Sequence, residues 1–303
     1  MKIFASRAPS RLPLLFLLIL GSLLSPASLD AAPSAPGVKI VSSAALPSAL
    51  GKVVYQKNTG SSIHIFIILN SHRSCSTGAN GSLTVEAQVE TFRIGEWLIR
   101  QKQVGLLLPE GFFGREESSP RVGMSAHRLD TGALEEKLTD TSTFVNADLL
   151  LHRVYGIGLH QVEDRDLYRK ARECLCAGLN GDAALALSDD RELRYLQTRR
   201  LAAILQNIPS AIEVEYRQGD ITRPRAMLTL GMAHLGDLLR FLKEGEIRIP
   251  SPRGDGEGFP AFREDLGLLK KKVGVTVIVP RALAANPGLM RLARLEPSPA
   301  AVP

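Results

Sequence analysis

The chain has 303 residues, of which 45 % are hydrophobic and 22 % charged, so it can bury one large core or two ordinary ones and is not disordered as a whole. Its three cysteines exclude a scaffold that depends on many disulfides. The 37 Lys and Arg outnumber the 31 Asp and Glu by six, and aromatic residues make up only 5 %, a balance that does not argue for nucleic-acid binding.

The first 32 residues have the pattern of a secretory signal peptide. Basic residues precede an apolar run over residues 12–24, and small residues follow, with cleavage expected near Ala31 or Ala32. We therefore expect an exported, periplasmic protein. The alternative is an uncleaved segment that anchors the protein in the inner membrane, for which this apolar run is short.

A segment rich in Ser, Ala and Pro follows the signal peptide. Residues 33–60 are predicted to be a leader into the fold. Residues 61–285 are predicted to form a single α/β domain, because apolar strands and amphipathic helices alternate there. The chain ends in EPSPAAVP, and residues 286–303 are predicted to be a disordered tail.

The alternation of elements predicts the fold class, which is a largely parallel sheet flanked by helices. Strands are predicted where apolar and β-branched residues concentrate, at 63–69, 104–108, 149–157, 225–230 and 275–279. Helices are predicted where apolar residues recur at helical spacing, at 84–103, 164–177, 183–208 and 235–244. The charged residues of the third helix, among them Arg199 and Arg200, are assigned to its solvated face.

One arrangement occurs twice in the chain, a strand followed closely by a histidine, a helix and a second strand. His72 comes after the strand at 63–69, and His234 comes after the strand at 225–230. Both histidines lie just past the carboxyl end of an apolar strand, which is the edge where open α/β sheets bind ligands. We therefore expect His72 and His234 to converge on one site.

Glu110 follows the second predicted strand and is expected at the same edge of the sheet. His72, Glu110 and His234 together supply two imidazoles and a carboxylate, which can hold a divalent metal ion and leave a position for water. Glu110 can instead be a catalytic general base, and Glu86 in the first helix is a second carboxylate candidate. The simpler alternatives are that His234 caps a helix, that Glu110 closes a turn and that Glu163 lies in a solvated loop.

Two short motifs carry a family resemblance. Gly231 and His234 have G-x-x-H spacing between a strand and a helix, and Glu110 is followed by Gly111 after a strand. These motifs resemble those of the TraB/Tiki/ChaN/erythromycin-esterase-like superfamily, with the closest likeness to uncharacterised exported bacterial members. The resemblance covers residues 60–282 and departs at Asn70, where the group often has an acidic residue.

The resemblance implies a metal-dependent hydrolase of the peptidase or esterase type, in which Glu110 is catalytic and His72, Glu110 and His234 bind a divalent metal ion. The alternatives are a non-catalytic protein of the same fold that binds haem or a small ligand through His72 and His234, and a degenerate structural or partner-binding member, which Asn70 favours. The expected ligand is a peptide or a small molecule. Basic residues are interleaved with acidic ones, which argues against nucleic acid, and only an uncleaved N-terminal segment would contact the membrane.

Overall fold

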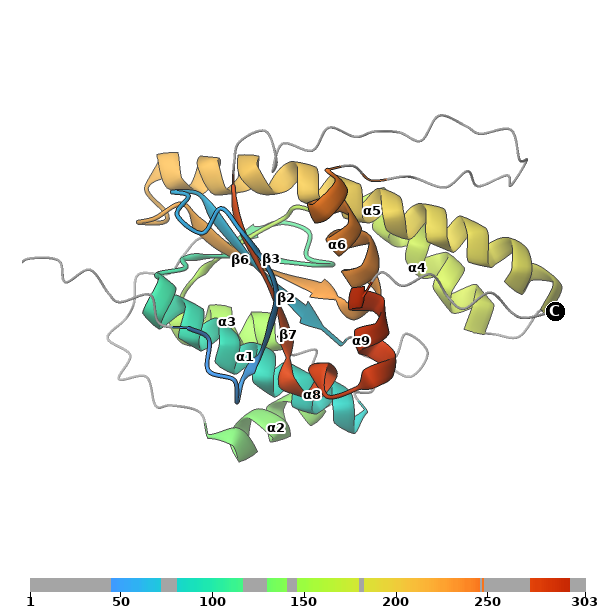
Figure 1. The fold of residues 1–303 in the computed structure, drawn as a ribbon, viewed down its shortest axis with the longest axis horizontal. Coiled ribbons are helices and arrows are strands. Elements are labelled where there is room, and N and C mark those ends of the chain that lie inside the picture. Colours follow the sequence, from blue (N-terminus) through green and yellow to red (C-terminus); the bar gives the residue numbers. More distant parts are fainter. Residues whose placement is uncertain are drawn as a thin grey trace, which may run out of the picture. The chain divides into compact units, whose positions relative to one another are not determined.

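The computed structural model describes residues 45–71, 81–116, 130–140, 146–179, 183–245, 247 and 273–294. Within these residues seven strands form one sheet in the order β1-β7-β2-β6-β3-β5-β4 (Figure 1). The strands are β1 (Gly51–Lys57), β2 (His64–Asn70), β3 (Leu106–Pro109), β4 (Arg115–Glu116), β5 (Gly158–His160), β6 (Arg225–Gly231) and β7 (Gly274–Pro280). The strands from β7 to β5 run parallel, and β1 and β4 flank them antiparallel. The predicted α/β fold with a largely parallel sheet is confirmed.

Helices cover both faces of this sheet (Figure 1). The described helices are α1 (Ser82–Lys102), α2 (Thr131–Thr139), α3 (Ala147–Tyr155), α4 (Arg165–Leu179), α5 (Ala183–Gln218), the 3-10 turn η1 (Met232–His234), α6 (Leu235–Glu244), α8 (Arg281–Ala284) and α9 (Pro287–Arg294). Buried residues of α5 and α6 share one core with the sheet, and buried residues of α1, α2 and α3 share the other.

The central strand β2 shows why a continuous apolar run is needed between two helical layers. Ile65 and Ile67 point into the core on the α5 and α6 side, while Phe66 and Ile68 point into the core on the α1 and α3 side. Successive side chains of a strand point to opposite faces, so a strand covered on both faces must be apolar at every position. Burying one such side chain contributes about 1.5–3 kcal/mol.

The two strand–helix–strand units interleave in the sheet. The first unit runs from β2 through α1 to β3, and β6 lies between its two strands. The second runs from β6 to β7, and β2 lies between its strands. The helices α1 and α6 that follow β2 and β6 pack on opposite faces. Two adjacent strands whose connections leave toward opposite faces mark the position where α/β folds bind ligands.

The strand predicted at 149–157 is wrong, because this segment forms the helix α3. The Asn146 side chain accepts the Leu149 N–H (2.9 Å) and caps the first turn, and Gly156 ends the helix in the left-handed region at φ 62°. Leu150 and Leu151 are buried against the sheet. A short apolar run reads equally well as strand or helix, and the capping residue decides for helix.

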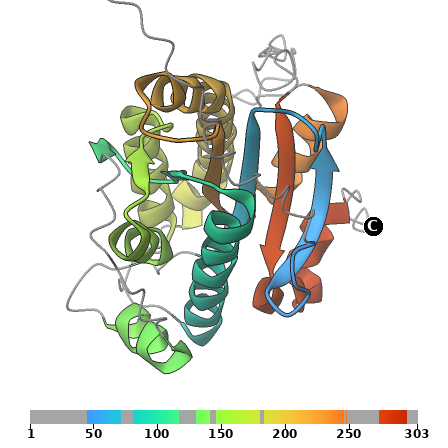
Figure 2. The ribbon, with the colours of Figure 1, turned by 90° about the vertical axis from the view of Figure 1, so that its left-hand side faces the viewer.

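The folded unit extends beyond residues 61–285 at both ends. Figure 2 shows β1 beside β7, running in the opposite direction, and the register pairs Gly51 with Pro280. At the other end, α9 follows α8 and its Leu289 and Met290 pack against the core on the α6 side. Among the described helices, none is both long and apolar enough to cross a membrane.

Candidate functional site

Glu110 and His234 lie together at the carboxyl edge of the sheet. Glu110 directly follows β3, and its backbone N–H donates to the carbonyl oxygen of Thr229 in β6 (3.1 Å). His234 ends η1, the turn that joins β6 to α6. Oε1 of Glu110 is 3.4 Å from Nε2 of His234, and both side chains are less than one tenth exposed. The structure thus brings two of the three predicted site residues into contact.

His72, the third predicted residue, lies outside the described residues. The strand that precedes it, β2, ends at Asn70, which pairs with Gly231 of β6. Asn70 is buried, and its Oδ1 accepts hydrogen bonds from the Ser71 N–H (2.8 Å) and the Thr91 hydroxyl (3.5 Å). Asn70 therefore anchors the end of β2 to its own backbone and to α1.

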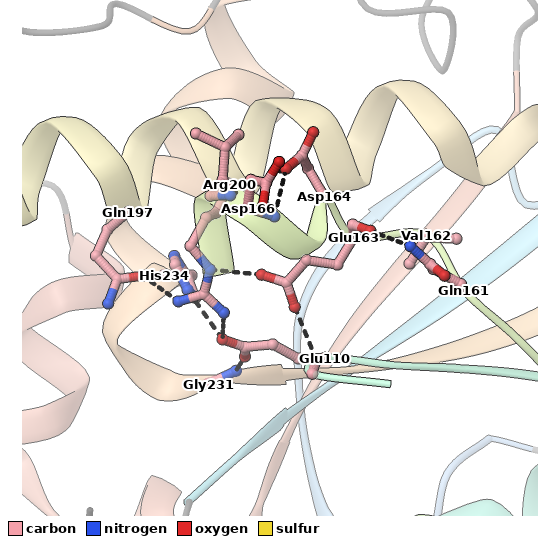
Figure 3. Close-up of polar contacts among 12 residues, drawn as sticks. Glu110, Gln161, Val162, Glu163, Asp164, Asp166, Gln197, Arg200, Gly231 and His234 are labelled. Atoms are coloured by element: carbon pink, nitrogen blue, oxygen red, sulfur yellow. Dashed lines mark hydrogen bonds and ion pairs between the residues drawn. The ribbon is translucent and has the colours of Figure 1, made fainter. Parts of the chain in front are cut away.

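Arg200 of α5 joins Glu110 to a second buried glutamate, Glu163 (Figure 3). Its Nη2 donates to Oε1 of Glu110 (2.8 Å), its Nε to Oε1 of Glu163 (2.5 Å) and its Nη1 to Oε1 of Gln197 (2.7 Å). The side chains of Arg200, Glu110 and Glu163 are 6 %, 8 % and 0 % exposed. Each guanidinium nitrogen has an acceptor, so this arginine holds both carboxylates in place.

Two glycine N–H groups complete the cluster. The Gly231 N–H at the end of β6 donates to Oε2 of Glu110 (2.6 Å), and the Gly111 N–H donates to Oε2 of Glu163 (2.8 Å). The side-chain amide of Gln161 also donates to the backbone carbonyl oxygen of Glu163 (2.8 Å), which fixes the segment before α4 (Figure 3). Each carboxylate therefore accepts one charged and one backbone hydrogen bond, an arrangement that stabilises the anion.

The charges of the cluster are strongly coupled. Burial lowers the pKa of Arg200, but the nearby Glu110 and Glu163 outweigh burial, and the net shift of this pKa is upward. Burial raises the pKa of Glu163, and the hydrogen bonds from Arg200 and the Gly111 N–H oppose that rise. Arg200 therefore stays positively charged, and its single positive charge lies between the two carboxylates of Glu110 and Glu163.

Tyr168 of α4 covers the guanidinium of Arg200. Its ring centroid is 4.9 Å from Cζ of Arg200, a cation–π geometry. The same ring lies against Gly111, where a Cβ atom would sit 3.2 Å from the ring. Gly111 also has φ 78°, so the turn after Glu110 needs glycine for its backbone conformation and for its contact with Tyr168.

Arg200, predicted on the solvated face of its helix, is buried. A helical pattern could have found it, because Leu196, Ile204 and Ile208 precede and follow it at intervals of four and all three are buried. Glu163, predicted in a solvated loop, is also buried. The sequence contains no signal for that burial, since the arginine that compensates Glu163 lies in another element.

The remaining predicted candidate, Glu86, pairs with Arg281 and not with Glu110 or His234. Its Oε1 is 3.8 Å from Nη2 of Arg281, and both side chains are more than half exposed. Within the described residues, no group of three His, Cys, Asp or Glu side chains is arranged to hold a metal ion. Of the three predicted metal ligands, Glu110 and His234 lie 3.4 Å apart, and His72 lies outside the described residues.

Comparison with known family models, with curated proteins and with solved structures finds no match to this chain. The same fold can support unrelated functions. We therefore infer function from the chemistry of the cluster formed by Glu110, Glu163, Arg200 and His234.

Proposed function

We propose that the protein is an exported hydrolase of the peptidase or esterase type, a TraB/ChaN-like protein in which Glu110 and His234 carry out the reaction. The observation that carries this proposal is the 3.4 Å contact between Oε1 of Glu110 and Nε2 of His234 at the carboxyl edge of the sheet. The motifs around Gly111 and Gly231 support it, since both glycines donate to carboxylates of the cluster.

Hydrolysis of an amide or ester needs a group that accepts a proton from water as its oxygen attacks the carbonyl carbon. Glu110 is held as an anion by Arg200 and the Gly231 N–H, with His234 beside it. The pair accepts the proton of the attacking water and returns it to the leaving amine or alcohol. Arg200 acts as a positioning residue, because it fixes the carboxylate of Glu110.

The predicted metal ligands His72, Glu110 and His234 belong to this proposal. A divalent ion held by these residues would lower the pKa of a bound water and so supply the nucleophile. Arg200 already donates to Oε1 of Glu110, so the carboxylate would contact the ion and the guanidinium together.

Purified protein, assayed on a panel of peptide and ester substrates with and without added Zn²⁺ or Mn²⁺, tests the proposal. We expect Glu110→Gln and His234→Ala to lower kcat at least about 100-fold, the range of a lost acid–base group. The matched control is Glu173→Gln, which removes an exposed glutamate of α4. Metal analysis of the same samples tests the ion. Wild-type protein that hydrolyses no substrate under any condition would overturn the proposal.

A second candidate is a non-catalytic protein that binds haem or a small ligand, or a degenerate structural member. The observation that favours it is that each oxygen of Glu110 accepts a hydrogen bond from the protein, as structural carboxylates do. Haem titration followed by absorbance tests the haem form. A Soret shift that His234→Ala abolishes supports it, and a titration without any shift removes it.

A further inference from the structure

An aromatic and cationic surface lies next to the cluster. We call it the rim and define it by Phe113, Tyr168 and Arg165. The rings of Phe113 and Tyr168 meet edge to face at 5.1 Å, and Cζ of Arg165 lies 5.3 Å from the Phe113 ring centroid. Since Tyr168 also stacks on Arg200, a continuous series of ring and cation contacts leads from exposed Arg165 to buried Arg200.

The backbone after β3 fixes the rim relative to Glu110. The Phe112 N–H donates to the carbonyl oxygen of Pro109 (3.3 Å), and the Gly111 N–H donates to Glu163. On the far side, the Gln161 N–H donates to the Gly114 carbonyl oxygen (2.9 Å). These bonds hold the segment at both ends, so the Phe113 ring has a defined place three residues from Glu110.

The rim has binding capacity that the fold does not use. Phe113 and Tyr168 are half-buried, and Arg165 is exposed. The Arg165 guanidinium contacts the Phe113 ring, and within the described part of the chain neither this guanidinium nor the Tyr168 hydroxyl makes an ion pair or a hydrogen bond. The neighbouring carboxylates are committed elsewhere, because Asp164 caps α4 and Asp166 lies 3.6 Å from Arg169.

We propose that the rim is the subsite that selects the substrate, and that it takes a peptide or ester with an apolar side chain and a free carboxylate. An arginine binds a carboxylate through two parallel hydrogen bonds, and aromatic rings take up a phenyl or alkyl group through edge and face contacts. The carboxylate would contact Arg165, and the apolar group would contact Phe113 and Tyr168. This inference rests on the proposed hydrolase for its substrate, while its binding test does not need turnover.

Two probes that differ by one carboxymethyl group, which carries the carboxylate, test the subsite: N-succinyl-L-phenylalanine amide and N-acetyl-L-phenylalanine amide. Calorimetric titration of the full chain is expected to show the succinyl probe binding about tenfold more tightly, as one charged hydrogen-bonded pair provides. Arg165→Ala should abolish this difference. Arg172→Ala removes an exposed positive charge from the same helix and should leave the difference unchanged. Equal binding of the two probes to wild-type protein, or no binding of either, overturns the proposal.

Chromogenic p-nitroanilides and p-nitrophenyl esters of the same two acyl groups separate this inference from the proposed function. We expect Arg165→Ala to raise KM about tenfold for the succinyl substrates, to leave kcat unchanged and to leave the acetyl substrates unaffected. If wild-type protein and Arg165→Ala hydrolyse succinyl and acetyl substrates with the same KM, the rim proposal is wrong and the proposed hydrolase activity is supported. If no substrate is hydrolysed but the succinyl probe still binds more tightly than the acetyl probe, the proposed hydrolase is wrong and the subsite is supported.

Discussion

Arg200 is the residue on which the buried charges of the site depend. Glu110 and Glu163 lie on either side of it, and all three side chains are almost completely removed from water. A buried carboxylate without a compensating charge is costly, whereas a paired and fully hydrogen-bonded one is tolerated. The arginine therefore explains why two glutamates from different elements can share the interior.

Replacement of Arg200 by Met should leave both glutamates buried without their cation. We expect the free energy of unfolding, measured by urea titration at pH 7, to fall by about 3–5 kcal/mol, the usual effect of removing one partner from a buried ion pair. Arg169→Met is the control, because Arg169 is more than half exposed and pairs with Glu173 at 3.4 Å. The control should cost less than about 1 kcal/mol. Equal losses in the two variants would show that Glu110 and Glu163 do not need this charge.

His64 shows the opposite case, a titratable side chain buried in the neutral form. Its Nε2 is 3.0 Å from the Thr276 hydroxyl and its ring stacks on Phe66 at 4.4 Å. Burial, followed by the positive charges of Arg225 and Lys102, lowers the pKa of His64 to about 4. His64 therefore supports the sheet as an uncharged residue and takes no part in the site, as its position inside an apolar strand predicts.

The lowered pKa of His64 predicts a specific pH dependence of stability. Above pH 6.5 the histidine is neutral in both states, and between about pH 6.5 and 4 only the unfolded chain gains a proton, so stability falls as the pH falls. Stability falls by about 3 kcal/mol across this window, the free energy that corresponds to lowering the pKa of His64 from 6.5 to about 4. The free energy of unfolding of His64→Gln, measured by the same urea titrations, is subtracted from that of the wild-type protein at each pH. The difference is the contribution of His64. A difference between the two proteins that does not change from pH 7 to pH 4 would contradict it.

At the scale of elements, the turn that follows β3 connects Glu110 and His234 to their surroundings. Pro109 ends the strand, Glu110 points to Arg200 and His234, and Gly111 reverses the chain with φ 78°. A side chain at Gly111 would be strained by the backbone and would press on the Tyr168 ring. The backbone conformation of this turn therefore also sets the position of Glu110 in the site.

Gly111→Ala should therefore lower the free energy of unfolding by more than a Gly→Ala substitution at another position with the same backbone conformation. Gly219 has φ 82° and no atom near the position of an added Cβ, which makes Gly219→Ala the matched control. We expect the control to lose about 1 kcal/mol from backbone strain alone. Gly111→Ala should lose about 1 kcal/mol more, because Tyr168 must move, and its kcat should fall as well. Equal thermal and kinetic effects of the two substitutions would argue against a role for the Tyr168 contact.

At the scale of the whole folded unit, the interleaved connections bring distant parts of the chain to one edge. Residues of β3 and β6 are more than one hundred positions apart, yet Leu106 to Pro109 pair with Ala226 to Thr229. The edge strand β1 extends the sheet past β7, and the Tyr55 hydroxyl of β1 donates to the Leu242 carbonyl oxygen of α6 (2.9 Å). The folded unit therefore extends beyond the predicted domain bounds, where Tyr55, Leu289 and Met290 are partly buried and pack against the core.

Fragments of the chain test these bounds. The fragment 45–294 contains β1 and α9 and should unfold cooperatively in a thermal melt. The fragment 61–285 lacks both and exposes the edge of β7, an apolar strand with every residue buried in the whole unit, so it should melt at a lower temperature or aggregate. Equal melting temperatures would show that β1 and α9 are dispensable.

Local patterns in the sequence determined most of the elements. The apolar runs of β2, β6 and β7 and the amphipathic helices α1 and α6 are recognisable because burial on a sheet or helix face imposes a period on the side chains. The predicted helix at 183–208 stops before Pro209, whereas α5 continues to Gln218. Buried Ile208, Ala211 and Ile212 show that packing outweighs the backbone bond that proline removes.

The sequence by itself determined the fold class and the presence of Glu110 and His234 at strand ends, because the direction of a parallel strand decides which edge its last residues reach. Only the tertiary structure decided that these two side chains touch, and that Arg200 and Glu163 are buried beside them. The physical reason is that a charged side chain carries no local mark of burial. Whether it faces water or an opposite charge depends on elements that meet only when the sheet has formed.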